Sequence, residues 1–335
     1  PRPACRPAGR GHPGWLRSGS PGIVTPTLQG RSPGWFSFSR LATLCLLAAA
    51  ASAQEPPPGG YRHRVDVQLV LVSASVTTPD GQPVTWLEQD AFEVYEDGTL
   101  RPLKVFEKKT ALPLQLVLLV DASLSAASEL PAEKMAMARF VQRVLRPPDA
   151  AALYEFSGGA RAVVDFSDDP QKLEAGLAQI LPRAGTALYD TLVEAAAKLK
   201  EREGRRVLVL VTDGNDTTSK NDYHAALRAA LEAEATIFAL VVRPIPGESG
   251  RSVRGEHVLI TFAEMTGGRS FFPARVAELD RFFDELSELL RTQYLLGYQP
   301  APPAWRSEFR TIEVRVKGSD YRVHHRKGYH SEPRP

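Results

Sequence analysis

The feature that most restricts the fold of this chain is a regular alternation of two hydrophobic patterns after Pro113. Short apolar runs, typical of buried strands, alternate with longer segments in which apolar residues recur at helical spacing. This alternation predicts a doubly wound α/β domain, with a mostly parallel sheet covered on both faces. The strand-like runs are residues 114–120, 150–156, 161–166, 206–212, 235–242 and 269–272. The helical segments are residues 131–145, 170–180, 188–200, 222–234 and 276–291.

Strand patterns of a different kind flank this α/β domain, which we expect to cover residues 113–291. Residues 61–110 and 292–331 hold short alternating runs separated by turn signals. Each segment has too few strands to bury a sheet face by itself. We therefore expect both segments to belong to one small all-β domain. The α/β domain is either inserted in this all-β domain or flanked by it. An independently folded C-terminal tail is the alternative.

The N-terminal part of the chain resembles an export signal. Residues 31–53 combine two arginines, a short apolar run and an Ala-Ser-Ala end, as secretory signal peptides do. The apolar run is too short to span a bilayer, so we expect no stable membrane span after cleavage. We expect residues 1–30 to be disordered or an upstream extension, and residues 54–60 to be a linker. The mature protein is then secreted, or lies in the periplasm or cell envelope.

Cleavage after Ala53 changes the chemistry that is available to the chain. Cys5 and Cys45 are removed, which excludes a thiol nucleophile, a Cys zinc site and an iron–sulfur cluster. Six arginines and no acidic residue are removed, which leaves 35 basic and 39 acidic residues and changes the net charge from +2 to −4. Nothing in this balance indicates nucleic-acid binding. We interpret the basic residues between Arg322 and Lys327 as the solvated face of an edge strand.

Oxygen-bearing side chains follow two of the predicted strands and precede one of the helices. They are Asp121, Ser123 and Ser125 after the first strand, Thr186 before the third helix, and Asp213 after the fourth strand. Asp and Ser also begin turns, so the first three residues alone do not decide between a turn and a site. Ligands of a parallel α/β sheet gather at the carboxyl ends of its strands. We therefore expect these oxygens to converge and to hold a hard divalent cation.

These motifs resemble a known family. The sequences D-A-S-L-S from Asp121, G-T-A-L-Y-D from Gly185 and T-D-G from Thr212 are similar to the metal-ion-dependent adhesion site of von Willebrand factor type A domains. The β segments on both sides resemble the exported bacterial proteins called VWFA-related, so the resemblance covers nearly all of residues 61–331. Many relatives have Gly where this chain has Leu124, which puts the flexibility of the loop in question but not the binding of the ion.

The resemblance implies a Rossmann-like fold and a role for each site residue. Ser123 and Ser125, and in part of the family Thr186, bind the ion directly, while Asp121 and Asp213 hold it directly or through water. Magnesium is the first choice, and manganese and calcium are alternatives. The usual final ligand in the family is a carboxylate of the partner. The resemblance thus implies an exported binding or adhesion module, not an enzyme, that recognises a protein or another carboxylate-bearing ligand.

Two other functions remain open at this point. A bound divalent ion also activates water, so a metal-assisted hydrolase is the first alternative. After the expected cleavage site at Ala53, the sequence contains no G-x-S-x-G, H-E-x-x-H or P-loop motif, which speaks against the common hydrolase types. The second alternative is a scaffold protein in which the metal only stabilises the fold.

Overall fold

The computed structural model describes residues 68–331, apart from 109–110, 243–252, 303–305 and 319. The predicted export signal, the linker and the segment before them lie outside the described residues. Within the described part of the chain, no helix combines the length and the apolar character that crossing a membrane requires.

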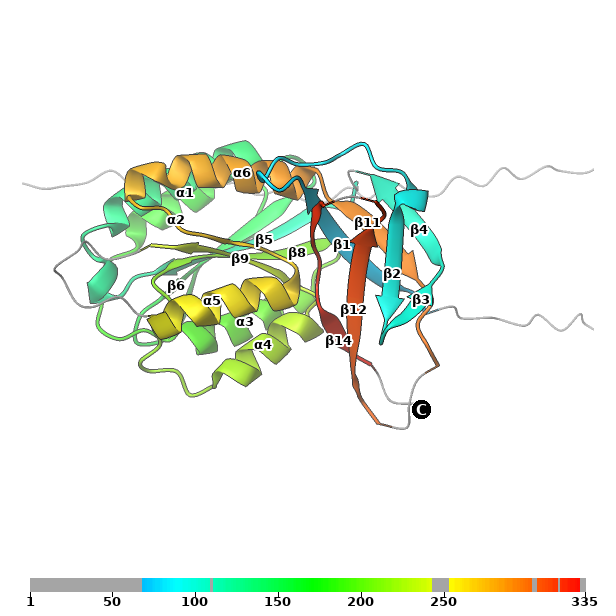
Figure 1. Cartoon of the computed structure of the whole chain (residues 1–335). Coiled ribbons are helices and arrows are strands. Elements are labelled where there is room, and N and C mark those ends of the chain that lie inside the picture. Colours follow the sequence, from blue (N-terminus) through cyan, green and yellow to red (C-terminus); the bar gives the residue numbers. More distant parts are fainter. Residues whose placement is uncertain (1–67, 109–110, 243–252, 303–305, 319, 332–335) are drawn as a thin grey trace, which may run out of the picture. The chain divides into compact units, whose positions relative to one another are not determined.

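A six-stranded sheet forms the centre of the α/β domain, in the order β10-β9-β8-β5-β6-β7 (Figure 1). Neighbouring strands are parallel except for β7, which pairs with β6 as an antiparallel edge strand. All eight residues of β5 are buried, as expected for a central parallel strand with both faces covered. The predicted fold class is confirmed. The strands are β5 Leu114–Asp121, β6 Ala150–Phe156, β7 Ala160–Ser167, β8 Arg205–Thr212, β9 Thr236–Val241 and β10 Ser270–Phe271.

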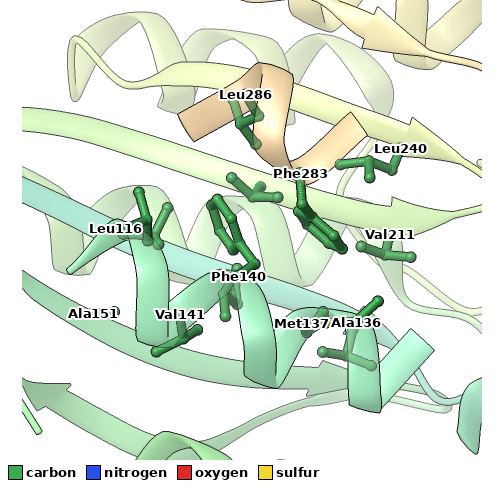
Figure 2. Packing of buried hydrophobic residues seen from close by; sticks show 14 of the residues in the cluster. Leu116, Ala136, Met137, Phe140, Val141, Ala151, Val211, Leu240, Phe283 and Leu286 are labelled. Atoms are coloured by element: carbon green, nitrogen blue, oxygen red, sulfur yellow. The ribbon is translucent and has the colours of Figure 1, made fainter. Parts of the chain in front are cut away.

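Helices cover the two faces of this sheet. One layer holds α1 (Leu130–Val144), α2 (Pro170–Gln179) and α6 (Leu279–Arg291), and the other holds α3 (Leu188–Lys200), α4 (Tyr223–Glu232) and α5 (Val253–Thr266). Successive side chains of β5 alternate between the two layers, so Leu118 packs in the first core and Leu119 in the second. In the first core, the rings of Phe140 and Phe283 stack with centroids 4.7 Å apart (Figure 2). Short 3₁₀ turns lie at Gln89–Ala91, Leu124–Ala126 and Val276–Glu278.

Helix α5 is an element that the sequence patterns do not predict. Its run Val258, Leu259, Ile260, Thr261, Phe262 is continuous and rich in β-branched residues, which hides the helical period and is typical of a strand as well. In the structure, Val258, Leu259 and Phe262 pack in the second core, which requires the helical spacing. Tertiary packing therefore decides the conformation of this segment.

Two four-stranded antiparallel sheets form the β domain, in the orders β13-β1-β11-β4 and β14-β12-β2-β3. Strands from before the α/β domain pair with strands from after it: β1 with β11, and β2 with β12. The C-terminal strands therefore do not form a sheet of their own. Tyr294 and Tyr298 are buried in the core that the two sheets share. The strands are β1 Val70–Thr77, β2 Phe92–Glu96, β3 Thr99–Arg101, β4 Leu103–Lys108, β11 Tyr294–Tyr298, β12 Phe309–Val316, β13 Arg322–His324 and β14 Gly328–His330.

The interpretation of the basic stretch from Arg322 to Lys327 as the solvated face of an edge strand is wrong for His325 and Arg326, although Arg322 of the edge strand β13 and Lys327 are exposed. His325 and Arg326 are buried, with 2% and 8% of their surface exposed. The guanidinium of Arg326 donates to Glu234 of the α/β domain and to the carbonyl of Leu71, each at 2.8 Å. Burial lowers the pKa of His325 to about 4, and its Nε2 accepts the N–H of Val314. This stretch thus joins the β domain to the α/β domain.

Gly267 lies where the backbones of the two domains approach each other closely. It follows the end of α5 with a φ of +86°, and a Cβ at this position would lie 2.4 Å from the backbone nitrogen of Arg326. Gly98, in the turn between β2 and β3, has a similar φ of +75°, but a Cβ there would meet nothing within 4 Å. The two glycines share a left-handed backbone and differ in the space around them.

This difference predicts unequal effects of two alanine substitutions. Both Gly98→Ala and Gly267→Ala should lose about 1–2 kcal/mol of unfolding free energy, because the left-handed conformation disfavours a Cβ. Gly267→Ala should lose about 1–3 kcal/mol more, because its methyl group overlaps the backbone of Arg326. Urea denaturation of both variants measures the difference. Equal losses would show that the two domains do not pack as tightly at this point as described.

Candidate metal centre

The candidate site lies where β5 and β8 end side by side. The register pairs Val120 with Val211, so that Asp121 is level with Thr212 at the same edge of the sheet. From β5 the chain continues to β6 and β7 on one side, and from β8 it continues to β9 and β10 on the other. The two strands therefore flank the point where the strand order reverses, which is where ligands of doubly wound sheets bind.

Asp121 is held in a fixed orientation at the end of β5. It is 1% exposed, its Oδ2 accepts the hydroxyl of Thr212 at 2.6 Å, and its Oδ1 accepts the N–H of Ser123 at 2.9 Å. Burial raises the pKa of Asp121, although the hydrogen bonds from Ser123 and Thr212 oppose this effect. A buried carboxylate is costly unless it is paired, so a cation beside Asp121 would stabilise its charged form.

The two serines of the first loop place their hydroxyls together. The Oγ atoms of Ser123 and Ser125 are 2.9 Å apart, with Ser123 buried and Ser125 exposed. In the octahedral shell of Mg²⁺, with oxygens at about 2.0–2.1 Å from the ion, neighbouring ligands are separated by about 3 Å. The distance is therefore compatible with two adjacent ligands of one ion, and equally with a hydrogen bond between the hydroxyls.

Thr186 belongs to a neighbouring loop that packs against the first one. The N–H of Arg183 in this loop donates to the carbonyl of Ala122 at 2.7 Å. The N–H of Thr186 donates to the hydroxyl of Thr217 at 3.0 Å, and its carbonyl accepts the N–H of Thr217 at 2.8 Å. These bonds fix the backbone of Thr186 between the other two loops of the site.

Asp213 and Asp216 follow β8 and have different surroundings. The carboxylate of Asp213 accepts the backbone N–H and the side-chain amide of Asn215, at 3.0 and 2.8 Å. Asp216 instead accepts the N–H of Tyr189 at 3.1 Å and the hydroxyl of Ser219 at 2.6 Å. Asp216 thus ties its loop to the start of α3.

A cavity of about 20 Å³ lies between these strand ends. Three of the five predicted site residues, Asp121, Ser125 and Asp213, line this cavity. Ser123 does not line it but is within hydrogen-bond distance of Asp121 and Ser125, and Thr186 lies outside the lining. The structure thus brings four of the five together and places the fifth in the adjoining loop. The lining residues are Asp121, Ser125, Ala126, Glu129, Glu133, Thr212, Asp213 and Val242.

The donor set fits a cation that accepts hydroxyl and water ligands. In the described ranges, no group of three or more His, Cys, Asp or Glu side chains is spaced to hold a metal ion. A cation at this edge would therefore need the hydroxyls of Ser123 and Ser125, and water, in addition to carboxylate oxygens. Such oxygen ligands suit Mg²⁺, Mn²⁺ and Ca²⁺.

Three polar residues of the cavity, Glu129, Glu133 and Thr212, are not among the ligands that the sequence predicts. Thr212 donates to Asp121, and its position just before Asp213 was the available signal. Glu133 lies on α1, and its signal was its place on the apolar face of that helix, where Leu130, Met137 and Phe140 are all buried. An acidic residue within such a stripe breaks the amphipathic pattern and marks a position that packing alone does not explain.

Comparison with known proteins bears on the identity of this domain. Residues 116–215 match the family model of the von Willebrand factor type A domain. The search of curated proteins found no significant match. Similar solved structures include BatB from Bacteroides thetaiotaomicron, with 20% identity, 53% of this chain and 100% of that chain covered, and a TM-score of 0.43. They also include a von Willebrand factor type A protein from Catenulispora acidiphila, with 12% identity, coverages of 78% and 74%, and a TM-score of 0.47.

A third similar structure is the pilus adhesin SpaC from Lactobacillus rhamnosus GG, with 10% identity, coverages of 78% and 48%, and a TM-score of 0.46. At these identities the similarity concerns the fold alone. The family model matches the segment that runs from β5 to the loop after β8, and the five predicted site residues all lie within it. The α/β domain of this chain is therefore a von Willebrand factor type A domain.

Proposed function

We propose that this protein is an exported binding module that captures a carboxylate-bearing ligand through a divalent cation. The observation that supports this function most strongly is the shared cavity at the ends of β5 and β8, where a buried carboxylate, an exposed hydroxyl and a second carboxylate meet. The cation is Mg²⁺ in the first place, with Mn²⁺ and Ca²⁺ as alternatives. The proposed ligands are Asp121, Ser123, Ser125, Thr186 and Asp213.

The chemistry of these ligands suits capture of an anion. Hydroxyl ligands such as those of Ser123 and Ser125 are neutral, so they leave the cation much of its positive charge. Ser125 is exposed, so the cation would be accessible from solvent on that side. A carboxylate of the partner then completes the coordination, and the attraction between cation and anion provides the specificity for acidic ligands.

The surface around the site supports a protein partner. Leu124 and Leu181, in the two loops that are bonded through Ala122 and Arg183, are each 61% exposed. Arg161 and Arg183 both donate to the same oxygen of the buried Glu155 at 2.7 Å, and both guanidiniums remain partly exposed. Apolar contacts next to two cationic groups fit a peptide segment in which an acidic residue has apolar neighbours.

A metal-assisted hydrolase remains the alternative, and one residue favours it. Glu133 shares the cavity, and its pKa is raised by burial, as is typical of a general base. Only 2% of its surface is exposed, however, so it lies too deep to reach a substrate bound at the exposed Ser125. None of the residues that line the cavity is a histidine, lysine or cysteine. Binding is therefore the better supported function.

Cation binding should depend on the carboxylate of Asp121 and the hydroxyl of Ser125. Asp121→Asn keeps the size of the side chain and one oxygen that accepts a hydrogen bond, but it removes the negative charge. Ser125→Ala removes an exposed hydroxyl ligand without opening a cavity in the core. We expect each to weaken Mg²⁺ and Mn²⁺ binding by at least about tenfold, since these groups contact the ion or orient its ligands. Isothermal titration calorimetry on the purified protein measures this loss.

The matched control for this experiment is Asp222→Asn. Asp222 caps α4 by accepting the N–H of Ala225, and asparagine caps helices equally well. This variant loses the same charge at a distance from the proposed ligands and should bind both cations as the wild type does. Wild-type affinity in Asp121→Asn and Ser125→Ala would refute the assignment of the site.

Ligand capture should require both the cation and a carboxylate. A surface coated with a peptide that contains one Glu between leucines should retain the protein in Mg²⁺, whereas the same peptide with Gln should not. Chelator, or the variant Asp213→Ala, should abolish retention while circular dichroism shows an intact fold, because Asp213 lies at the rim. Since the mature chain has a net charge of −4, bulk charge does not attract it to an acidic surface.

Three outcomes would contradict this mechanism. They are equal retention on the Glu and Gln peptides, retention that survives the chelator, and a wild type that is not retained in Mg²⁺. Turnover of a generic phosphate or carboxylic ester that disappears in Asp213→Ala would favour the hydrolase instead.

A further inference from the structure

A glutamate is buried beneath the proposed cation site. Glu133 lies in the first turn of α1, with 2% of its surface exposed. Its neighbours on the same face of the helix, Leu130 and Met137, belong to the hydrophobic core. Glutamate is almost never fully buried unless it is paired, so its burial here calls for a compensating contact.

Glu133 lacks such a contact at one of its carboxyl oxygens. Its Oε2 has no hydrogen-bond partner among the described residues, although it is inaccessible to bulk solvent. A buried polar atom without a partner is destabilising, and more so when the group is charged. The start of a helix favours an acidic residue through the helix dipole, but this effect is weaker than the penalty for an unsatisfied buried charge. Helix stability alone therefore does not account for this side chain.

The surroundings of Glu133 are themselves acidic. Burial raises the pKa of Glu133 well above its usual range, and the negative charges of Asp121, Glu129 and Asp213 raise it further. These three acids line the same cavity as Glu133. Like charges around one small cavity destabilise each other, and a cation among them reverses the sign of this interaction.

The size of the cavity indicates how Glu133 interacts with a cation. The volume of about 20 Å³ is enough for one water molecule, which needs about 10–15 Å³. Polar partners for such a water are provided by Asp121, Ser125 and Thr212, which line the cavity together with Glu133. Within the described residues, no group of three or more His, Cys, Asp or Glu side chains is spaced to hold a metal ion, so we place Glu133 outside the direct ligands of the cation. A water molecule is the link that fits the space.

We propose that Glu133 is a positioning residue of the cation site, whose Oε2 accepts a hydrogen bond from a water molecule in this cavity and orients that water towards the cation. The inference rests on the proposed function and extends it. It adds a further buried acidic side chain to the cavity that Asp121 and Asp213 line. Groups that orient the ligands of a metal in this way typically contribute about 10–100-fold to its affinity.

The test uses Glu133→Gln, which keeps the size of the side chain and removes its charge. We expect the affinity for Mg²⁺ and Mn²⁺, measured by isothermal titration calorimetry, to fall about 10–100-fold. Thermal melting without added cation should show a folded protein. Glu133→Asp keeps the charge but withdraws the carboxylate by one methylene, so we expect an intermediate affinity. The control is Glu288→Gln, which removes one charge from an exposed position of α6 and should leave the affinity unchanged.

The outcomes separate this inference from the function on which it rests. If the wild type binds the cations, Asp121→Asn does not, and Glu133→Gln binds as the wild type does, this inference alone is overturned and Glu133 has a structural role only. If Glu133→Gln does not fold, the test uses Glu133→Asp. The inference is overturned if Glu133→Asp binds the cations with the same affinity as the wild type. A wild type that binds neither cation overturns the proposed function, and the inference with it.

Discussion

The parallel pairing of β5 with β8 is the constraint on which the rest of the α/β domain depends. It runs in continuous register from Leu114 opposite Arg205 to Val120 opposite Val211, and β5 is buried along its whole length. A shift by one residue would exchange the side chains that face the two helical layers, so both cores fix this register. The same register brings Asp121 level with Thr212 and places Asp213 just beyond the strand end. Core packing thus determines the geometry of the site.

The position of the β domain follows from the two ends of β5. The strand begins soon after β4 of the β domain, and it ends at the candidate metal centre. At the amino end of β8, the buried Arg205 donates to Gln293 at 3.2 Å, just before β11. The β domain is therefore attached at the amino ends of the central strands (Figure 1), and the candidate centre occupies their carboxyl ends. A ligand can reach the proposed cation without displacing the β domain.

The candidate centre gathers buried acidic side chains in one place. Most of the space between sheet and helices is filled by apolar side chains, but here Asp121 and Glu133 are buried close to Asp213. Such an arrangement is unfavourable by itself, because burial and like charges both disfavour the ionised carboxylates. Residues that oppose local stability in this manner are concentrated at functional sites, where a ligand compensates the cost. A cation bound at this edge would therefore compensate the electrostatic cost of these carboxylates.

The sequence by itself determined the fold class, most strand and helix positions, and the five candidate ligands, because these depend on local periodicity and on residues at strand ends. Helix α5, the burial of His325 and Arg326, and the presence of Glu133 in the cavity were decided only by the tertiary structure. Each depends on what packs against the segment: the second core for α5, Glu234 and Leu71 for Arg326, and the ends of β5 and β8 for Glu133. Local pattern does not contain these contacts, since they join residues far apart in the chain, and burial and charge at such positions are properties of the folded surroundings.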